Sequence, residues 1–410
     1  MLIPLQKAEA ATCGDKAAGL GALLRAGLPV PDGFVVPFAV YLTVVRELAQ
    51  GDSLQGGPAN TAELLQDRPL RRPLLEALGL ALGRLGARTV AVRSSATGED
   101  SRHASAAGQY ETTLAVHGLP AIAHAISTCW ASLLSPRAMA YRSRSGPAHF
   151  DGEELAMAVI VQRHLDADVS GVMFTPTSSD GATAIDSAWG LGPGVVAGTV
   201  TPDTYRVEAD GTVTGTVADK RTRLDRIGSH LLTRGVPAEG RRRATLDEGI
   251  ARELAALGEK VVETLGTPQD IEWAVAEGRV WLLQARPITV APPTTVLATS
   301  TRSGSFFLTG IPGSAGTATG TARTVRGPDD FARVRPGDIL VCPFTDPAWT
   351  PLLRLAGGVV TETGGALSHA AIVAREHGIP AVLGLAGALT SIPDGAVVTV
   401  DGTAGAVTTA

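Results

Sequence analysis

The sequence predicts a mixed α/β and α+β protein of more than one domain, and three observations support this prediction. The chain has 410 residues, 44% of them hydrophobic, which suffices for two or three cores at about 100–200 residues per domain. Helical and strand-like patterns alternate along most of it. A Pro-, Thr- and Ser-rich stretch interrupts them and indicates a linker over residues 291–305. We therefore expect one domain over residues 1–290 and a smaller one over 306–410.

The first domain is expected to begin with a helix over residues 17–26, because Gly27 follows it and prolines stand just beyond. Its last element is expected to be a hairpin of residues 270–275 and 280–286, which turns at Glu277-Gly278. Periodicity and β-branched content predict the elements between them: strands at 89–93, 155–162 and 169–174, and helices at 121–134 and 247–265.

The second domain is glycine-rich, and its pattern predicts a compact α/β unit. Its clearest strands are expected at residues 338–342, 358–361 and 397–401. One helix is predicted over residues 368–376, where Gly378 and Pro380 end it.

Composition and charge exclude several classes of partner. The formal net charge is −5 and no basic block stands out, so we expect neither nucleic acid nor an anionic membrane surface as a partner. The start of the chain lacks the plan of a signal peptide, and no apolar run is long enough to span a membrane. Cys13, Cys129 and Cys342 are far apart and match no metal spacing, which indicates unreactive thiols and a cytoplasmic location.

His369 follows Gly364-Gly365 and opens the predicted helix. The first turn of a helix offers free N–H groups and a partial positive charge, which stabilise an anion. The same field disfavours a protonated imidazole, so His369 is expected to be a neutral nucleophile whose phosphorylated form those N–H groups would hold. The alternative is a helix cap with an incidental histidine.

Two further segments could bind phosphate. Arg93 lies near the end of a predicted strand and precedes a loop of small residues, whose N–H groups can approach phosphate oxygens. Lys16 stands at a glycine turn before the first helix, in a chain whose other lysines are Lys7, Lys220 and Lys260. The alternatives are a flexible surface loop and a solvated lysine.

The predicted hairpin could hold a metal. Alternation puts Asp270 and Glu272 on one face, and Gln284 and Arg286 on one face. With a three-residue loop, Glu272 would face Gln284 and Asp270 would face Arg286, and their oxygens would suit Mg²⁺. A two-residue loop would mismatch the faces, so a metal role requires an odd loop, in which Gly278 could supply the left-handed residue of a G1 bulge. The alternative is exposed polar alternation.

These segments, in this order, resemble the family of phosphoenolpyruvate synthase, pyruvate phosphate dikinase and rifampin phosphotransferase. The stretches AVRSSATGEDSRHASAAGQYET, WGLGPGVVAG and DIEWA…WLLQARPIT resemble its ATP-grasp nucleotide-binding domain. TDPAWTPLL and GGALSHAAIVAREHGIPAVLG resemble its swivelling phosphohistidine domain. The resemblance covers nearly the whole chain and implies an ATP-grasp domain followed by a small swivelling α/β domain.

The resemblance also implies roles for single residues. It places Lys16 and Arg93 on the phosphates of ATP, Gln162 at the adenine edge, and Arg286 on phosphate. It assigns Glu272 and Gln284 to Mg²⁺. His369 becomes the carrier of the ATP β-phosphate, and AMP and inorganic phosphate are released.

The chain departs from the family in three places. Pro193 ends the Gly190–Pro193 motif where the family often has Glu, so a role of that Glu is lost or moved. Leu367-Ser368 precede the histidine, nearer the Leu-Thr of rifampin phosphotransferase, so regulation through a threonine there is not expected. The chain stops at Ala410, without the phosphoenolpyruvate/pyruvate barrel or a rifampin-binding domain.

Three functions follow as hypotheses. The first is a phosphotransferase whose acceptor is a small molecule or is bound by a partner subunit. The second is a phosphocarrier subunit whose acceptor site lies on a partner protein. The third, an inactive homologue that only binds nucleotide, is disfavoured because the motif residues are intact.

Overall fold

A computed structural model describes residues 1–50, 57–101, 104–105, 109–139, 155–178, 181–290 and 307–409. The chain forms two compact units. Unit 1 comprises Met1–Asp166, Asp225–Leu232 and Leu257–Pro287, and unit 2 comprises Ala167–Leu224, Thr233–Ala256 and Ile288–Ala410. The predicted linker over residues 291–305 lies outside the described residues, and the domain boundaries stay a prediction.

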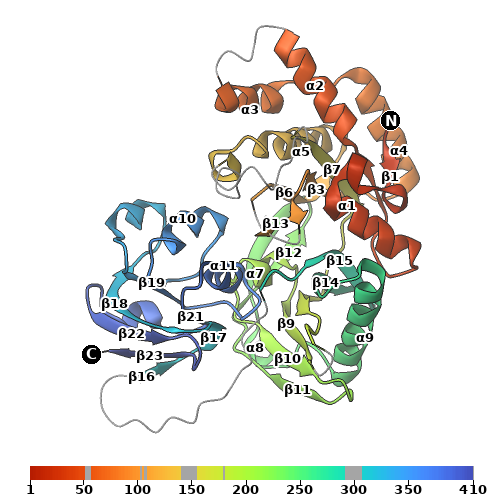
Figure 1. Cartoon of the computed structure of the whole chain (residues 1–410). Helices are drawn as coiled ribbons and strands as arrows, with labels where there is room; N and C mark the ends of the chain where they lie inside the picture. Colours follow the sequence, from red (N-terminus) through yellow and green to blue (C-terminus); the bar gives the residue numbers. More distant parts are fainter. Residues whose placement is uncertain are drawn as a thin grey trace. The chain divides into compact units, whose positions relative to one another are not determined.

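Unit 1 is built on a five-stranded sheet in the order β1-β2-β7-β3-β6 (Figure 1). The strands of this sheet are β1 (Ile3–Pro4), β2 (Gly33–Val36), β3 (Thr89–Ala96), β6 (Thr112–His117) and β7 (Met157–Arg163). All of its neighbouring strands run antiparallel. The strands predicted at 89–93 and 155–162 are therefore confirmed, although β3 is three residues longer than expected.

The remaining elements of unit 1 are helices, a short ribbon and the predicted hairpin. They are α1 (Ala10–Arg25), α2 (Phe38–Gln50), α3 (Gly57–Asp67), α4 (Arg72–Leu85), α5 (Leu119–Ser132), β4 (Asp100–Ser101), β5 (Ala104–Ser105), β14 (Gln269–Ala276) and β15 (Arg279–Pro287). The helix α9 (Glu248–Leu265) and the strands β12 (Thr222–Ile227) and β13 (His230–Gly235) have residues in both units.

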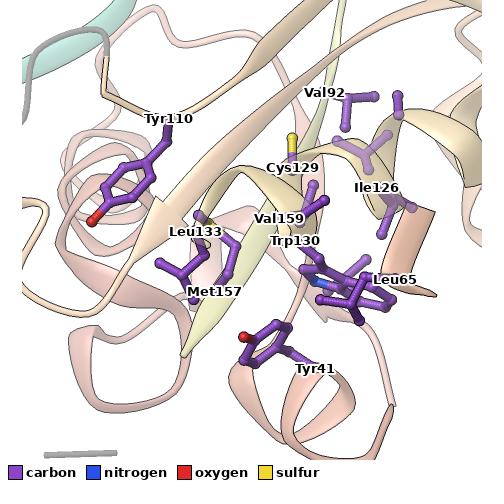
Figure 2. Close-up of a cluster of buried hydrophobic side chains, with 14 of the residues drawn as sticks. Tyr41, Leu65, Val92, Tyr110, Ile126, Cys129, Trp130, Leu133, Met157 and Val159 are labelled. Atoms are coloured by element: carbon purple, nitrogen blue, oxygen red, sulfur yellow. The ribbon is translucent and has the colours of Figure 1, made fainter. Parts of the chain in front are cut away.

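Strand alternation gives the five-stranded sheet two different faces. One face is apolar: Val92 and Val159 pack with Trp130 of α5 and with side chains of α2 and α3 (Figure 2). Leu78 of α4 belongs to the same cluster. The opposite face carries Arg93 and Gln162, which alternate with those valines along β3 and β7. The helix α1 lies on this second face, where the Ala17 N–H donates to Ser95 Oγ at 3.1 Å. The hydrophobic core thus covers one face and leaves the other for polar residues.

A kink at Gly14 interrupts α1. Gly14 has φ 79°, and a Cβ there would come within 2.5 Å of Ser95 Oγ. Only glycine combines that backbone conformation with so close an approach to β3. The helix predicted over residues 17–26 is therefore the second part of a longer one, and Lys16 lies in the first turn after the kink.

The first part of unit 2 is an antiparallel meander. Its elements are β8 (Val169–Phe174), β9 (Thr183–Trp189), α7 (Pro193–Val196), β10 (Asp203–Val207), β11 (Val213–Thr216) and α8 (Ala238–Arg241). The strand predicted over residues 169–174 is confirmed.

The second part of unit 2 is an eight-stranded sheet in the order β16-β23-β22-β18-β19-β20-β21-β17 (Figure 1). Its strands are β16 (Phe307–Thr309), β17 (Ile311–Ser314), β18 (Thr317–Thr324), β19 (Ile339–Cys342), β20 (Gly358–Thr361), β21 (Ala381–Leu383), β22 (Val397–Asp401) and β23 (Ala406–Thr409). Its helices are α10 (Thr350–Leu353), α11 (His369–His377) and α12 (Ala388–Ser391). The strands β18, β19, β20 and β21 pair in parallel.

Separate hydrophobic clusters cover this sheet. The side containing Leu340 and Val359 packs with α10 and α11, and the side containing Val341 and Val360 packs with α12. The helix and strands predicted here agree with the structure to within one residue at each end. Among the residues described, no helix has the length and apolar character needed to cross a membrane.

Unit 2 also contains a fully buried ion pair. Lys220 Nζ donates to Asp203 Oδ1 at 2.5 Å and to the Ala218 carbonyl at 3.1 Å. The second oxygen of Asp203 accepts from the backbone and side chain of Thr245, at 2.9 Å each. Both charged side chains are 0% exposed. These hydrogen bonds satisfy the buried charges of Asp203 and Lys220. The same bonds tie β10 to the segments that carry Ala218 and Thr245.

We expect Lys220→Met to lower the free energy of unfolding by about 3–5 kcal/mol, because it leaves the Asp203 carboxylate buried without its counter-charge. Urea denaturation measures this change. The control is Arg252→Ala, which removes an exposed pair with Glu248 and should cost less than about 1 kcal/mol. Equal costs for the two variants would contradict the structural role of the buried pair.

Candidate functional site

The β14–β15 hairpin turns through two residues, Glu277 and Gly278, which have φ 56° and 73°. The prediction that a metal role requires an odd loop is therefore wrong. The extra residue stands inside β15 instead: Trp273 pairs with Leu282, whereas Glu272 pairs with Gln284, so Leu283 is left as a bulge. The bulge produces the predicted facing pair of Glu272 and Gln284 without an odd loop.

Arg93 joins the five-stranded sheet to this hairpin. Its Nη1 donates to the carbonyl of Leu283, the bulged residue, at 2.7 Å. Its Nη2 donates to Glu272 Oε2 at 3.2 Å. The Arg93 side chain is 9% exposed and that of Glu272 24%. A nearly buried guanidinium is thus fixed by a backbone acceptor and a carboxylate whose edge reaches solvent.

A second cation on the hairpin is held in a similar way. Asp270 and Arg286 face each other across the strands, as predicted. Arg286 Nε and Nη2 both approach Asp270 Oδ2, at 2.8 Å and 2.7 Å. The pair is largely buried, which holds the guanidinium in one orientation.

Lys16 is a third nearly buried cation. Its Nζ donates to Glu99 Oε1 at 2.5 Å, and both side chains are less than 10% exposed. Glu99 also accepts from the Ala96 N–H at 2.9 Å and from Ser94 Oγ at 3.3 Å. Glu99 therefore ties Lys16 to the end of β3, the strand that carries Arg93.

Gln162 lies on the same face of the sheet as Arg93, opposite Ala91 in the neighbouring strand. Its side-chain amide is buried, and Nε2 donates to the Pro31 carbonyl at 2.9 Å. That bond holds the amide in one orientation at the β2–β7 edge. Unit 1 thus brings Arg93, Gln162, Glu272, Gln284 and Arg286 to one sheet face and its hairpin, with Lys16 on the helix that covers this face.

The donor set fits Mg²⁺. Glu272 and Gln284 offer a carboxylate and an amide oxygen on facing positions, and both side chains are partly exposed. Within the described residues, no group of three or more His, Cys, Asp or Glu side chains could hold a metal. A cation here would therefore need water and ligand oxygens as well, which is the usual coordination of Mg²⁺.

His369 is the first residue of α11 in unit 2 and is 4% exposed. Ser368 precedes it, and its Oγ donates to the Gly365 carbonyl at 2.8 Å. Arg375, which lies further along α11, donates from Nη1 to the carbonyls of Ala366 and Gly313, at 2.8 Å each. These bonds brace the loop over residues 364–368, which we call the His loop, and hold His369 at the helix N-terminus as predicted.

Several residues of these sites were not identified from the sequence. Glu99 and Asp270 are the carboxylates that position Lys16 and Arg286, and only Asp270 had been given a facing partner. The Leu283 carbonyl carries no sequence signal, because any residue offers one. Asp186 of β9, which accepts from the Leu367 N–H at 3.1 Å, likewise lies in no chemical motif. Burial raises the pKa of the Cys129 and Cys342 thiols, which agrees with the prediction of unreactive thiols at these two positions.

Comparison with known proteins shows the family to which the chain belongs. The family described as "Pyruvate phosphate dikinase, AMP/ATP-binding domain" matches residues 10–303. The family described as "PEP-utilising enzyme, mobile domain" matches residues 334–405. The resemblance and the fold class predicted from the sequence are both confirmed.

Curated relatives match nearly the whole chain. A probable phosphoenolpyruvate synthase of Methanothermobacter thermautotrophicus is 36% identical over 98% of this chain and 62% of its own length. One of Archaeoglobus fulgidus is 36% identical over 99% of this chain and 57% of its own length. The phosphoenolpyruvate synthase of Aeropyrum pernix is 36% identical over 96% of this chain and 56% of its own length. The chain thus spans about three fifths of the length of these relatives.

The buried Lys16–Glu99 pair yields a stability prediction. Glu99→Gln should lower the free energy of unfolding by roughly 1.5–3 kcal/mol, because the ammonium loses its charged acceptor. Urea denaturation measures the loss. Glu76→Gln is the control, since its pair with Arg72 is exposed and should contribute less than about 1 kcal/mol. If Glu99→Gln were as harmless as this control, Glu99 would not be what holds Lys16.

Proposed function

The chain belongs to the pyruvate phosphate dikinase family, and we propose that it is an ATP-dependent phosphotransferase that phosphorylates His369. In the proposed half-reaction, ATP, water and the imidazole give AMP, inorganic phosphate and phospho-His369. The bond between the β-phosphorus and the oxygen that bridges to the α-phosphorus breaks as a bond to an imidazole nitrogen forms, and AMP leaves. Water then attacks the γ-phosphorus, and the bond between this phosphorus and the oxygen that bridges to the β-phosphorus breaks, which releases inorganic phosphate and leaves the β-phosphate on His369. The phosphate then passes to an acceptor, which we propose is a small molecule.

The observation that carries this proposal is that carboxylates hold three cationic side chains of unit 1 in place. Lys16, Arg93 and Arg286 are nearly buried, and each has its own carboxylate partner. Charges fixed before a ligand arrives need little reorganisation during a reaction, which makes them effective against charge that develops on phosphate. We assign Lys16 and Arg93 to the ATP phosphates, and Arg286 to the phosphate that is released.

Gln162 and the hairpin complete the proposed nucleotide site. With Nε2 on Pro31, the amide oxygen of Gln162 is assigned to the adenine amino group. Glu272 and Gln284 would hold Mg²⁺, which neutralises phosphate charge when bound. Arg93 orients Glu272 through their hydrogen bond, so this carboxylate is positioned before any cation binds.

The helix N-terminus supports the role of His369. The free N–H groups of the first turn of α11 would stabilise the charge of phospho-His369. The His loop holds the ring at this position through Ser368 and Arg375. The buried position of His369 would also keep water from the phosphorylated ring.

The alternative is a phosphocarrier subunit whose acceptor site lies on a partner protein. Incubation with ATP labelled at the β-phosphate distinguishes the two functions. Label that leaves the protein only when a second protein is added favours the carrier. We also propose a cytoplasmic location, which three buried free cysteines support.

We expect His369→Ala to abolish acid-labile phosphoenzyme and AMP formation while the affinity for ATP changes less than about twofold, because no nucleotide contact is assigned to His369. Autoradiography after acid and base treatment, together with calorimetric titration of ATP, measures both quantities. Wild-type levels of acid-labile phosphate in the variant would refute His369 as the carrier.

We expect Arg93→Ala and Glu272→Gln each to slow phosphoenzyme formation by about 10²–10³-fold, because one removes a phosphate-binding charge and the other a metal-ligating charge. Rapid-quench kinetics measures the rate. Arg163→Ala and Glu277→Gln are matched controls, since they remove a solvent-exposed pair between β7 and the turn of the same hairpin. A normal rate in either site variant would refute the role of that residue.

A further inference from the structure

The His loop lies on a face of the β8–β9 strands within unit 2. Val172 and Phe174 of β8 and Ala188 of β9 form one hydrophobic cluster with Leu367 and Ile372. Asp186 alternates with Ala188 along β9 and pairs with Val172 across the strands, so its side chain belongs to the same face. It is 3% exposed. A carboxyl group is therefore buried in a largely apolar contact between the His loop and β9.

Two hydrogen bonds fasten this region: one joins the His loop to β9, and one joins the residue before the loop to the segment that follows α7. The Leu367 N–H, two residues before His369, donates to Asp186 Oδ2 at 3.1 Å. Thr363 Oγ1 donates to the Gly198 carbonyl at 2.7 Å. One bond lies on each side of Gly364 and Gly365, so together they set the position of the loop.

The close approach of the His loop to Asp186 and Pro202 depends on Gly365. A Cβ at this residue would lie 2.4 Å from Asp186 Oδ2 and 2.6 Å from Pro202 Cγ. The backbone of Gly365 is not in the left-handed region, so its conformation alone does not require glycine. The close packing against Asp186 and Pro202 does require it.

We propose that Asp186 is a positioning residue, whose buried carboxyl holds the His loop on the β8–β9 face through the Leu367 N–H and makes this docked position sensitive to pH. The docking itself stands on the contacts above. Only its consequence, that Asp186 sets how readily a phosphate-carrying loop departs, rests on the proposed function.

The direction of the pH effect follows from burial. Burial raises the pKa of Asp186 to about 7, and the Leu367 N–H and the Arg375 charge oppose this rise only in part. The strand partners of Asp186 on either side, Val172 and Thr204, carry no charge. Once the loop leaves, water reaches the carboxyl and its pKa falls toward the ordinary value of about 3.9. The docked state therefore binds more protons than the undocked state.

The docked and undocked pKa values of Asp186 determine how strongly the docking constant depends on pH. Docking is strongest below the pKa of the undocked carboxyl and weakens as the pH rises through that of the docked one. With these two values, the docking constant should fall roughly 10-fold between about pH 6 and about pH 8. Asp186→Asn keeps an oxygen acceptor for the Leu367 N–H and removes the titratable group, so this substitution should remove the pH dependence of docking.

Hydrogen exchange of the full chain without nucleotide tests the proposal. The readout is the protection of a peptide spanning residues 363–370, corrected for intrinsic exchange and referred to a peptide from β22. Wild-type protection should be roughly 10-fold lower at about pH 8 than at about pH 6. Asp186→Asn should change less than about twofold over the same range. Gly365→Ala should lose protection at both pH values, because its Cβ occupies the space of Asp186 Oδ2.

One control variant accompanies this experiment, and two outcomes would contradict the proposal. Gly327→Ala should behave like wild type, since its Cβ would meet nothing within 4 Å. Persistence of the full pH dependence in Asp186→Asn would assign it to another group, such as His369, and overturn the proposal. Wild-type protection in Gly365→Ala would overturn it as well. Because no ATP is present, these results do not depend on whether His369 is phosphorylated.

Discussion

The arrangement of the site in unit 1 depends on one constraint: the nearly buried guanidinium of Arg93 needs fixed hydrogen-bond acceptors. The Arg93 side chain extends from the polar face of the five-stranded sheet and donates to two groups of a hairpin about 180 positions later in the chain. One acceptor is the carbonyl of Leu283, which the bulge displaces from the regular ladder. The same bulge brings Glu272 opposite Gln284 and Asp270 opposite Arg286. A single extra residue thus supplies both the backbone acceptor and the facing side chains.

The three cations of unit 1 share one design. Lys16, Arg93 and Arg286 each pair with a different carboxylate, so the positive charges that would otherwise repel one another are held close to one sheet. Buried ion pairs of this kind add little stability, since desolvation offsets the attraction. Their effect is positional: each side chain has one orientation before a ligand binds. That property suits a site for a highly charged ligand better than a site that must be assembled on binding.

Unit 2 holds its histidine by a different device. The His loop is short, glycine-rich and fastened by backbone groups rather than by ion pairs. Leu367 and Ile372 contribute apolar contact, and Asp186 contributes a side-chain acceptor for the Leu367 N–H. An apolar contact is insensitive to pH, whereas a buried carboxyl is not, so a single residue on β9 makes the docked position responsive to protons. Gly365 makes the contact possible because its missing side chain leaves room for that carboxyl.

The fold class and most of the elements could be predicted correctly from the sequence, which also offered the motif residues from Lys16 to His369 as candidates. Periodicity, turn residues and motif spacing are local properties, and they sufficed for α11, β19, β20 and β22. The hairpin shows the limit: its facing pairs were predicted correctly, but a two-residue turn with a bulge in β15 produces them instead of a longer loop. The groups that position the motif residues could be identified only once the fold was known. Glu99 is 83 positions from Lys16, and Asp186 is 181 positions from Leu367. Pairs at such separations follow from how strands and helices pack, which no local pattern encodes.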